Sequence, residues 1–348
     1  MFSPLGKGPL NCHSLPMLTF GMTGGGGFDP LVLLLLALIV EAYVGEARLV
    51  FKAVRHPVKI IGDGIAFFDR KLNREDRSEV DRAVRGVLVV VLVVGLAGAI
   101  GWGIAWLSLN HAFGWVLELA ALISLLAARG LYDRVSKVAR ALRGNVEDAR
   151  RAVSHIVGRD PDSLDGPGVA RAAIETLAEN FGDGVVSPVF WYVLFGFPGL
   201  LVYKAVNTMD SMIGYRSPKY RAFGMTAARL DDALNFIPAR LAGLFLVFAA
   251  AFVPTAKPLQ ALRIMVRDSR FHRSFNAGWP EGAMAGALGL ALAGPRRYPG
   301  TTINDPWIGD GNAKAGPKDI SRALYLYFVA CLINAMWVAA IAMVRFSL

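Results

Sequence analysis

Residues 168–188 (GVARAAIETLAENFGDGVVSP) and residues 203–241 (YKAVNTMDSMIGYRSPKYRAFGMTAARLDDALNFIPARL) decide the fold of this chain, because they gather carboxylates, amides and basic groups within a strongly apolar sequence. Hydrophobic residues make up 54% of the 348 positions, above the roughly 45–50% of soluble domains. Apolar segments flank both stretches, and charged groups are costly in such surroundings unless they have partners. We therefore interpret residues 168–241 as a metal- and phosphate-handling site at the face of a membrane.

Several apolar runs approach the length of about 20 residues that a helix needs to cross a bilayer. We predict transmembrane helices at 30–51, 86–109, 115–131 and 323–344. The apolar segment 188–206 is broken by Gly196, Pro198 and Gly199, and both of its flanks carry site residues. We therefore expect a re-entrant hairpin or a broken helix pair there, since irregular backbone at membrane depth is tolerated where protein buries it.

The predicted fold class is all-α, a polytopic integral membrane protein with about four spans plus re-entrant or broken helices and cytoplasmic helical loops. Residues 241–254 are also short for a span, so we expect a re-entrant or broken segment there as well. The Ala/Gly-rich residues 281–294 suit tight helix packing. No polar linker divides the chain, so we expect one membrane-embedded catalytic domain, 29–348, after a disordered tail, 1–28.

The net charge of +10 has two interpretations that can both hold. Lys and Arg collect in cytoplasmic loops, and residues 52–85 are rich in both. A basic protein also attracts anionic substrates such as nucleotides. We accordingly expect a site on the cytoplasmic face of the cell (inner) membrane, with the lipid bilayer as a partner and no nucleic acid. The two cysteines, Cys12 and Cys331, exclude a disulfide framework.

Residues 132–158 have the three- and four-residue apolar spacing of an amphipathic helix. We interpret them as one cytoplasmic helix that packs on the site and turns a basic face to solvent; contact with lipid headgroups is the alternative. The turn residues at 160–168 predict the end of this helix.

Arg171, Glu175, Glu179 and Asp183 are spaced by four and would share one face of a helix. Carboxylates on one face suit Mg²⁺, which takes oxygen ligands and shares them with substrate phosphates. The alternative is a salt-bridge ladder on a solvated helix. Glycines at 182 and 184 predict that the helix ends near Asp183.

Two more pairs of oxygen ligands follow, in Asn207-x-x-Asp210 and in Arg229-Leu-Asp231-Asp232-x-x-Asn235. Paired aspartates before an asparagine are typical of acidic boxes that hold Mg²⁺ against a diphosphate, although Asp also caps helices. The predicted metal ligands are Asp183, Asp210, Asp231 and Asp232. The predicted phosphate and substrate contacts are Asn180, Lys204, Asn207, Arg216 and Arg229, because Arg can bind phosphate with two parallel hydrogen bonds.

No Walker-type phosphate loop, H-E-x-x-H motif or nucleophile elbow is present. His56 and His272, taken alone, are more typical of structural or surface histidines.

Three stretches together resemble one family. ARAAIETLAENFGDGVVSPVFW (170–191), residues 203–241 and SFNAGWPEGAMAGALG (274–289) are similar to the adenosylcobinamide-phosphate synthase family of cobalamin biosynthesis. The resemblance covers roughly residues 31–345. This chain differs from the family in two loops, at Gly45-Glu46-Ala47 and at Ser274-Phe275-Asn276, while His56-Pro57-Val58 matches.

The resemblance implies an ATP- and Mg²⁺-dependent ligase that joins the carboxylate of a corrinoid, cobyric acid, to (R)-1-amino-2-propanol phosphate through an acyl phosphate. It implies catalytic roles for Glu175, Glu179, Asp210 and Asp232. It also implies substrate or phosphate contacts at His56, Arg171, Asn276, Trp279 and Glu281. A homo-oligomer is compatible with the sequence.

Two other functions fit the same polar groups. One is an intramembrane Mg²⁺-dependent prenyl or phosphoalcohol transferase, which would turn over without ATP. The other is a non-catalytic membrane regulator or transporter, which would need a substrate path through the bilayer.

Overall fold

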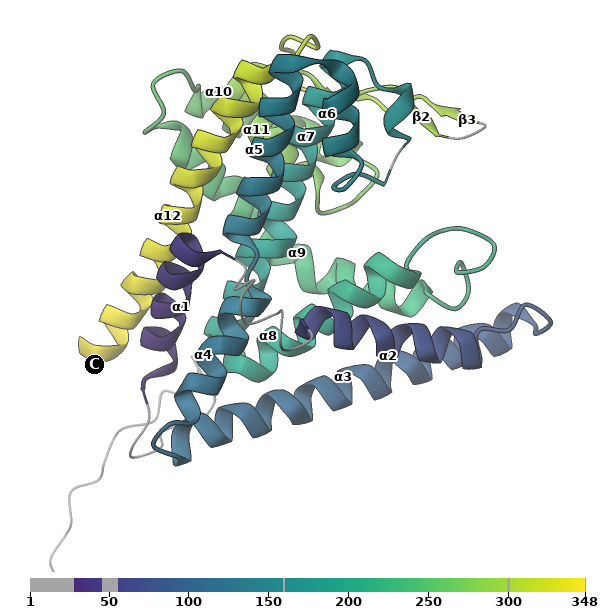
Figure 1. The fold of residues 1–348 in the computed structure, drawn as a ribbon, viewed down its shortest axis with the longest axis vertical. Coiled ribbons are helices and arrows are strands. Elements are labelled where there is room, and N and C mark those ends of the chain that lie inside the picture. The colour runs from purple at the N-terminus through teal and green to yellow at the C-terminus, as the bar shows by residue number, and fades with distance from the viewer. Residues whose placement is uncertain (1–27, 46–55, 159, 299–300, 348) are drawn as a thin grey trace, which may run out of the picture.

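A computed structural model describes residues 28–45, 56–158, 160–298 and 301–347 (Figure 1). Almost all of its regular structure is helical, which confirms the predicted fold class. The helices are α1 (Pro30–Val44), α2 (Pro57–Leu72), α3 (Glu79–Asn110), α4 (Gly114–Leu125), α5 (Ala128–Gly144), α6 (Val146–Val153), α7 (Gly166–Phe181), α8 (Ser187–Ile213), α9 (Met225–Ala250), α10 (Pro258–Asp268), α11 (Gly278–Leu288) and α12 (Pro317–Ser347). The predicted disordered tail lies, up to residue 27, outside the described residues.

Four short strands, which were not predicted, form two antiparallel pairs. They are β1 (Leu292–Ala293) with β4 (Trp307–Ile308), and β2 (Arg296–Tyr298) with β3 (Thr301–Ile303). Three short turns complete the structure: η2 (Pro161–Ser163), η3 (Gly182–Val186) and η4 (Ser269–Phe271).

Among the described residues, five segments are long and apolar enough to cross a membrane, which confirms a multi-pass membrane protein. They are Glu79–Asn110, Gly114–Gly144, Gly166–Ile213, Met225–Ala250 and Pro317–Ser347. Three of them contain the spans predicted at 86–109, 115–131 and 323–344. The remaining two carry the four predicted metal ligands. The first predicted span, 30–51, is described to residue 45 and contains the shorter apolar helix α1.

Helix α3 turns much of its apolar surface outward, where lipid would cover it. Val91 and Trp102, for example, are 62% and 59% exposed. Its inner face packs closely on α8 at Gly101, where a Cβ atom would stand 2.6 Å from the Cα of Pro198. Small residues therefore let these two helices approach, as expected in membrane helix packing.

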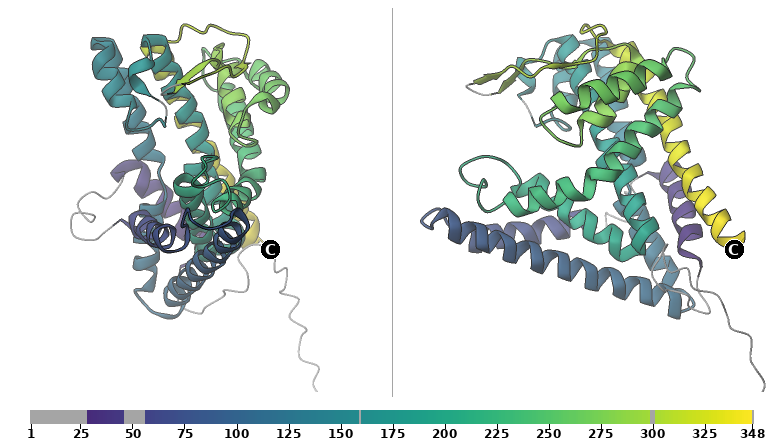
Figure 2. Two further views of the ribbon diagram at one scale, coloured as in Figure 1. Left: turned by 90° about the vertical axis from the view of Figure 1, so that its right-hand side faces the viewer. Right: turned by 180° about the vertical axis from the view of Figure 1, so that it is seen from behind.

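Figure 1 shows two directions of packing. Helices α5, α7 and α12 stand upright, while α2 and α3 run side by side across the lower part of the molecule. The views in Figure 2 agree, and they place α10, α11 and the strands at the upper end. The largest buried core surrounds α7 and takes side chains from α5, α9, α11 and α12. The helix that begins the quoted stretch is therefore the centre of the upper half.

The amphipathic segment 132–158 packs on α7, as predicted, but it is not one helix. Helix α5 begins at Ala128, and the chain breaks at Asn145, whose side chain caps α6 by accepting from the Asp148 N–H at 2.7 Å. An asparagine that bonds the backbone in this way starts a new helix. Val135 and Val138 are buried in the core around α7.

Helix α8 is a hairpin of two limbs, as the sequence predicted. Gly196 has φ 64° and ψ −156°, which no helix contains and which essentially only glycine adopts. A straight helix would put residues 183 and 203 about 30 Å apart. Instead, the Tyr203 hydroxyl lies 2.9 Å from the Asp183 carbonyl oxygen. The chain therefore returns on itself, and the flanks of 188–206 meet.

The prediction of a re-entrant or broken segment at 241–254 was wrong, because α9 is a single helix over Met225–Ala250 that is long enough to cross a membrane. The acidic box lies in its first turns, so polar and apolar parts form one continuous helix. Pro238 lies inside the helix. The tight packing predicted for 281–294 is confirmed at Gly286, where a Cβ atom would stand 2.5 Å from the Gln260 carbonyl oxygen.

Candidate active site

One buried asparagine, Asn235 of α9, joins both limbs of the α8 hairpin. Its Oδ1 accepts from the Ser187 hydroxyl at 2.7 Å and lies 2.9 Å from the Tyr203 hydroxyl. Because two hydroxyl groups face this oxygen, the amide nitrogen faces Asp231 and donates to its Oδ2 at 2.9 Å. The hairpin thereby fixes the orientation of a carboxylate on the neighbouring helix.

Asp231 is held by amides on both oxygens. Asn207, on the returning limb of α8, donates to Oδ1 at 3.3 Å, opposite the bond from Asn235. The residue is 8% exposed. Two neutral amide donors therefore fix the orientation of both carboxylate oxygens.

Asp183 lies beside this carboxylate, in the π-helical turn η3 that connects α7 to α8. Such turns are rare and occur often at functional sites. The charges that act on Asp183 come from Asp231, Glu179 and Asp210, and from one cation, Lys204. The group therefore has more carboxylates than cations. Helix α7 ends at Phe181, which confirms the predicted helix end near Asp183, and the chain continues through Gly182 and Gly184 as this turn.

An outer group of charges continues this site towards solvent. Asp210 and Asp232 interact with each other, and Arg229 and Arg216 both act on Asp232. Asp232 and the two arginines are exposed, whereas Lys204 is buried. The four predicted metal ligands, Asp183, Asp210, Asp231 and Asp232, thus form one region, which we call the acidic cluster.

The four residues predicted to share one face of α7 contact two different parts of the structure. The Arg171 guanidinium donates to the Ala313 carbonyl oxygen and lies 5.3 Å from the ring centre of Trp307. Glu175 is 4% exposed, and it accepts from the Ala293 N–H of β1 at 2.9 Å. The structure therefore engages Arg171 and Glu175 with the strand region, and it brings Glu179 and Asp183 to the acidic cluster.

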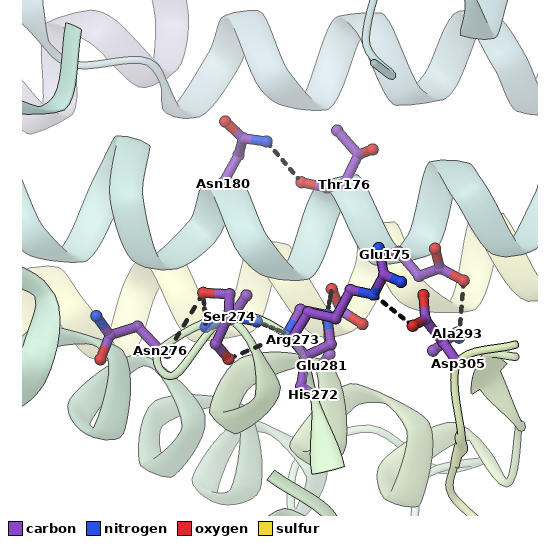
Figure 3. A network of polar contacts seen from close by, with 11 residues as sticks. Glu175, Thr176, Asn180, His272, Arg273, Ser274, Asn276, Glu281, Ala293 and Asp305 are labelled. Atoms are coloured by element: carbon purple, nitrogen blue, oxygen red, sulfur yellow. Dashed lines mark hydrogen bonds and ion pairs between the residues drawn. The ribbon is translucent and has the colours of Figure 1, made fainter. Parts of the chain in front are cut away.

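Two other predicted site residues bond to nearby backbone. Asn180 is exposed and donates to the Thr176 carbonyl oxygen at 3.0 Å, on the side of α7 away from residues 272–276 (Figure 3). His56 caps α2, and its Nδ1 accepts from the Val58 N–H at 3.3 Å. Their proposed contacts with substrate stay predictions.

The loop of residues 272–277, which we call the histidine loop, lies between η4 and α11 (Figure 3). His272 Nε2 lies 3.4 Å from Glu281 Oε1, and Nδ1 lies 3.1 Å from the Ser274 carbonyl oxygen, which can accept from the protonated ring. Burial opposes the charged ring, but the Glu281 carboxylate outweighs it and, with a smaller contribution from Glu179, raises the pKa of His272 to about 9. A protonated histidine therefore lies beside a buried carboxylate at neutral pH.

Asn276 connects the histidine loop to the acidic cluster. Its amide nitrogen donates to the Asp232 carbonyl oxygen at 2.9 Å. Two buried oxygens near here, Asn276 Oδ1 and Glu281 Oε2, have no hydrogen-bond partner within the described residues. Such groups cost about 1–3 kcal/mol each when they stay unsatisfied, so they mark positions where a donor from a bound molecule fits.

Trp279, in the first turn of α11, contacts α9 as well: its ring centre is 4.5 Å from the Arg240 guanidinium. Arg240, Ser187 and Tyr203 are residues of this region to which the sequence assigned no role, and His272 was interpreted only as a structural or surface histidine. A partial signal was available, because Arg240 follows Asp232 at eight residues on one helical face and His272 directly precedes the motif at 274–289.

The acidic cluster fits a magnesium ion that is shared with a substrate. Mg²⁺ is usually bound through one or two carboxylates plus waters and phosphates. Within the described ranges, no group of three or more His, Cys, Asp or Glu side chains is arranged to hold a metal on its own. Buried carboxylates in excess of cations supply suitable oxygen donors, and Asp231 and Asp183 would be the inner ligands.

Comparison with known proteins gives one consistent result. A family model described as "CobD/Cbib protein" matches residues 34–327. A "Cobalamin biosynthesis protein CobD" of Sinorhizobium sp is 47% identical over 319 residues, which is 90% of this chain and 98% of the relative. The proteins of that name from Rhizobium meliloti (strain 1021) and Brucella suis biovar 1 (strain 1330) are 43% and 45% identical, over 90% and 86% of this chain and 97% and 92% of theirs. No solved structure matches the chain.

Proposed function

Because the chain belongs to the CobD/Cbib family of cobalamin biosynthesis, we propose that it is a carbon–nitrogen ligase that makes cobinamide phosphate. The proposed reaction joins the free carboxylate of cobyric acid to the amine of (R)-1-amino-2-propanol phosphate and uses ATP with Mg²⁺. The observation that carries this proposal is the acidic cluster. It combines oriented carboxylates with Lys204, Arg216 and Arg229 at a place open to solvent on one side.

The first step is the transfer of the γ-phosphoryl group of ATP to an oxygen of the corrinoid carboxylate. The bond from the γ-phosphorus to the bridging oxygen breaks, ADP leaves, and an acyl phosphate forms. In such transfers, positioning and charge stabilisation account for most of the catalysis. Lys204, Arg216 and Arg229 would bind phosphate oxygens, with Arg able to hold two at once. A magnesium ion held by Asp183 and Asp231 would neutralise negative charge on the phosphates.

In the second step, the amine nitrogen attacks the acyl carbon. The bond from that carbon to the phosphate oxygen breaks, inorganic phosphate leaves, and the nitrogen gives up a proton. Glu179 and Asp232 are exposed, so either can receive this proton. The negative charges of Asp210 and Asp232 repel each other, which favours uptake of a proton at this pair. Glu175 is buried against β1, so in this mechanism it positions the strand region.

We propose that the site faces the cytoplasm, across the cell (inner) membrane from the turn at 110–114. The basic loop 52–85 favours this orientation by the positive-inside rule. Loop residues 214–224 lie near that loop, because Arg221 pairs with Glu79 at the start of α3. ATP is abundant on that side of the membrane.

One assay separates this function from the two alternatives. Purified protein in detergent is incubated with cobyric acid, aminopropanol phosphate and Mg²⁺, with and without ATP, and the corrinoid is read by mass. We expect the amide product only in the mixture that contains ATP. Product without ATP would favour a transferase, and no product under either condition would favour a regulator or transporter.

A further inference from the structure

A second cluster of side chains, Phe236, Arg240, Phe275 and Trp279, lies beside the acidic cluster, and we call it the arginine–aromatic cluster. The Arg240 guanidinium lies 3.7 Å from the ring centre of Phe236, 4.5 Å from that of Trp279 and 5.1 Å from that of Phe275. The two phenylalanine rings are stacked, with centres 5.7 Å apart and planes at 19°. One cation therefore contacts three rings that come from α9 and from the loop and first turn of α11.

The cluster has both a free charge and open ring surface. Among the residues that the structure describes, no carboxylate pairs with Arg240, whose guanidinium donates to the Phe236 carbonyl oxygen. Phe236 and Phe275 are 45% and 57% exposed. Large exposed rings beside an unpaired guanidinium suit a planar ring that carries negative charge elsewhere, since aromatic faces stack and Arg binds anions.

The arginine–aromatic cluster lies on the same face of α9 as Asp232 of the acidic cluster. Asp232, Phe236 and Arg240 are spaced by four, so they lie along one face of α9. Eight helical residues span about 12 Å. Asn276 holds the histidine loop, and with it Phe275, close to Asp232, because its amide nitrogen donates to the Asp232 carbonyl oxygen. A ligand with phosphates at the acidic cluster and a ring at the arginine–aromatic cluster would therefore be elongated along α9.

We propose that the arginine–aromatic cluster binds the base of the nucleoside triphosphate whose phosphates occupy the acidic cluster. This inference rests on the proposed function, because it assumes that ATP is a substrate. A purine base is planar and stacks on aromatic faces such as those of Phe236 and Phe275. Its triphosphate would extend along α9 towards the acidic cluster.

The test separates recognition of the base from recognition of phosphate. The dissociation constants of ATP and of inorganic triphosphate, each with Mg²⁺, are measured by calorimetry on the full chain in detergent. Phe236→Ala and Phe275→Ala each remove one ring. Phe271→Ala is the matched control, because Phe271 is 47% exposed and lies 4.8 Å from the guanidinium of its own arginine, Arg270, outside the cluster.

We expect each cluster variant to bind ATP roughly tenfold more weakly, the size of effect that loss of one base-stacking ring has. Inorganic triphosphate should bind as it does to the wild type, which also shows that the variant is folded. If an alanine variant does not fold, the corresponding leucine variant keeps the bulk and removes the stacking. In addition, ATP should change tryptophan fluorescence in the wild type and not in Trp279→Phe.

Four results would overturn the inference, and they differ from one another. Wild-type affinity for ATP in both ring variants would show that the base binds elsewhere. Equal weakening of ATP and triphosphate would show that the rings only support the fold of the phosphate site. A wild type that binds triphosphate and ATP equally has no base site, whereas one that binds neither also contradicts the proposed use of ATP.

Discussion

Asp231 and Asp232 are neighbours in the chain but have different surroundings. Asp231 is buried between the amides of Asn207 and Asn235, while Asp232 is exposed and close to Arg216 and Arg229. The difference follows from helical geometry, since adjacent residues point about 100° apart. In the proposed mechanism, the buried carboxylate of Asp231 binds the metal. The exposed carboxylate of Asp232 binds the metal, accepts the proton, or does both.

Asp232→Asn tests the outer assignment. Loss of one carboxylate should raise the Mg²⁺ concentration for half-maximal ligation by roughly 10- to 100-fold, because the amide offers a weaker ligand without charge. The measurement is ligation rate against Mg²⁺ in membranes. Asp148→Asn is the control, because Asp148 lies in a surface pair with Arg151 on α6. A wild-type rate with unchanged Mg²⁺ dependence would remove Asp232 from the metal site.

His272 predicts a pH dependence of stability. Its pKa of about 9 lies above the usual 6.5, chiefly because the Glu281 carboxylate outweighs the effect of burial. The stabilisation is therefore fully present below pH 6.5 and is lost as the pH rises through 9; a shift of this size corresponds to about 3 kcal/mol. Thermal unfolding in detergent should show a difference between wild type and His272→Gln that shrinks over this range. A constant difference from pH 6 to 10 would mean that the ring is neutral throughout.

The hairpin of α8 is the element on which the site depends. Its reversal at Gly196 brings Tyr203 to Asp183 and Asn207 to Asp231. The sequence allowed this to be predicted, because glycines and a proline interrupt an apolar run between two polar flanks. It did not predict the π-helical turn at 182–186, since the glycines at 182 and 184 indicated only that α7 ends near Asp183.

Gly196→Ala should destabilise the protein by about 1–3 kcal/mol, the cost of a side chain in this backbone conformation. The loss of activity should exceed the loss of folded protein, because the limbs of the hairpin position the carboxylates. Gly95→Ala on α3 is the control: no atom lies within 4 Å of the added Cβ, and its backbone is helical. Equal unfolding temperatures for the two variants would show that the reversal tolerates a side chain.

Other elements show where sequence reasoning stops. The four-residue spacing along α7 correctly placed Arg171, Glu175 and Asp183 on a helix or its end, but it could not show that β1 and the residues near 313 take up the first two. Those contacts join residues more than 110 positions apart. Likewise, the raised pKa of His272 depends on the neighbouring Glu281 carboxylate, and the sequence does not show that these two residues are in contact.

The whole molecule separates two ends of one long helix. Helix α3 has 32 residues and is therefore about 48 Å long. Its first turn contacts the loop 214–224, where Arg221 pairs with Glu79, and its last residue precedes the turn at His111. The loop 214–224, which carries Arg216, and the turn at His111 therefore lie at opposite ends of a helix that is long enough to cross a bilayer.

This arrangement predicts opposite accessibility of two positions. In a protein with Cys12 and Cys331 replaced by serine, Ser217→Cys should react with a membrane-impermeant thiol reagent only when the cytoplasmic side is open. His111→Cys should react in intact cells. Both positions are exposed in the fold, so burial does not explain a difference. Labelling of both from the same side would contradict the proposed orientation.

The central claim is that ATP drives amide formation through an acyl phosphate. Cobyric acid labelled with ¹⁸O in its carboxylate tests it most directly, with wild-type protein, ATP, Mg²⁺ and aminopropanol phosphate. We predict that each amide formed is accompanied by one inorganic phosphate that carries one ¹⁸O atom, because the bond from the acyl carbon to the phosphate oxygen breaks. Unlabelled phosphate, label in AMP, or amide formed without ATP would contradict the account.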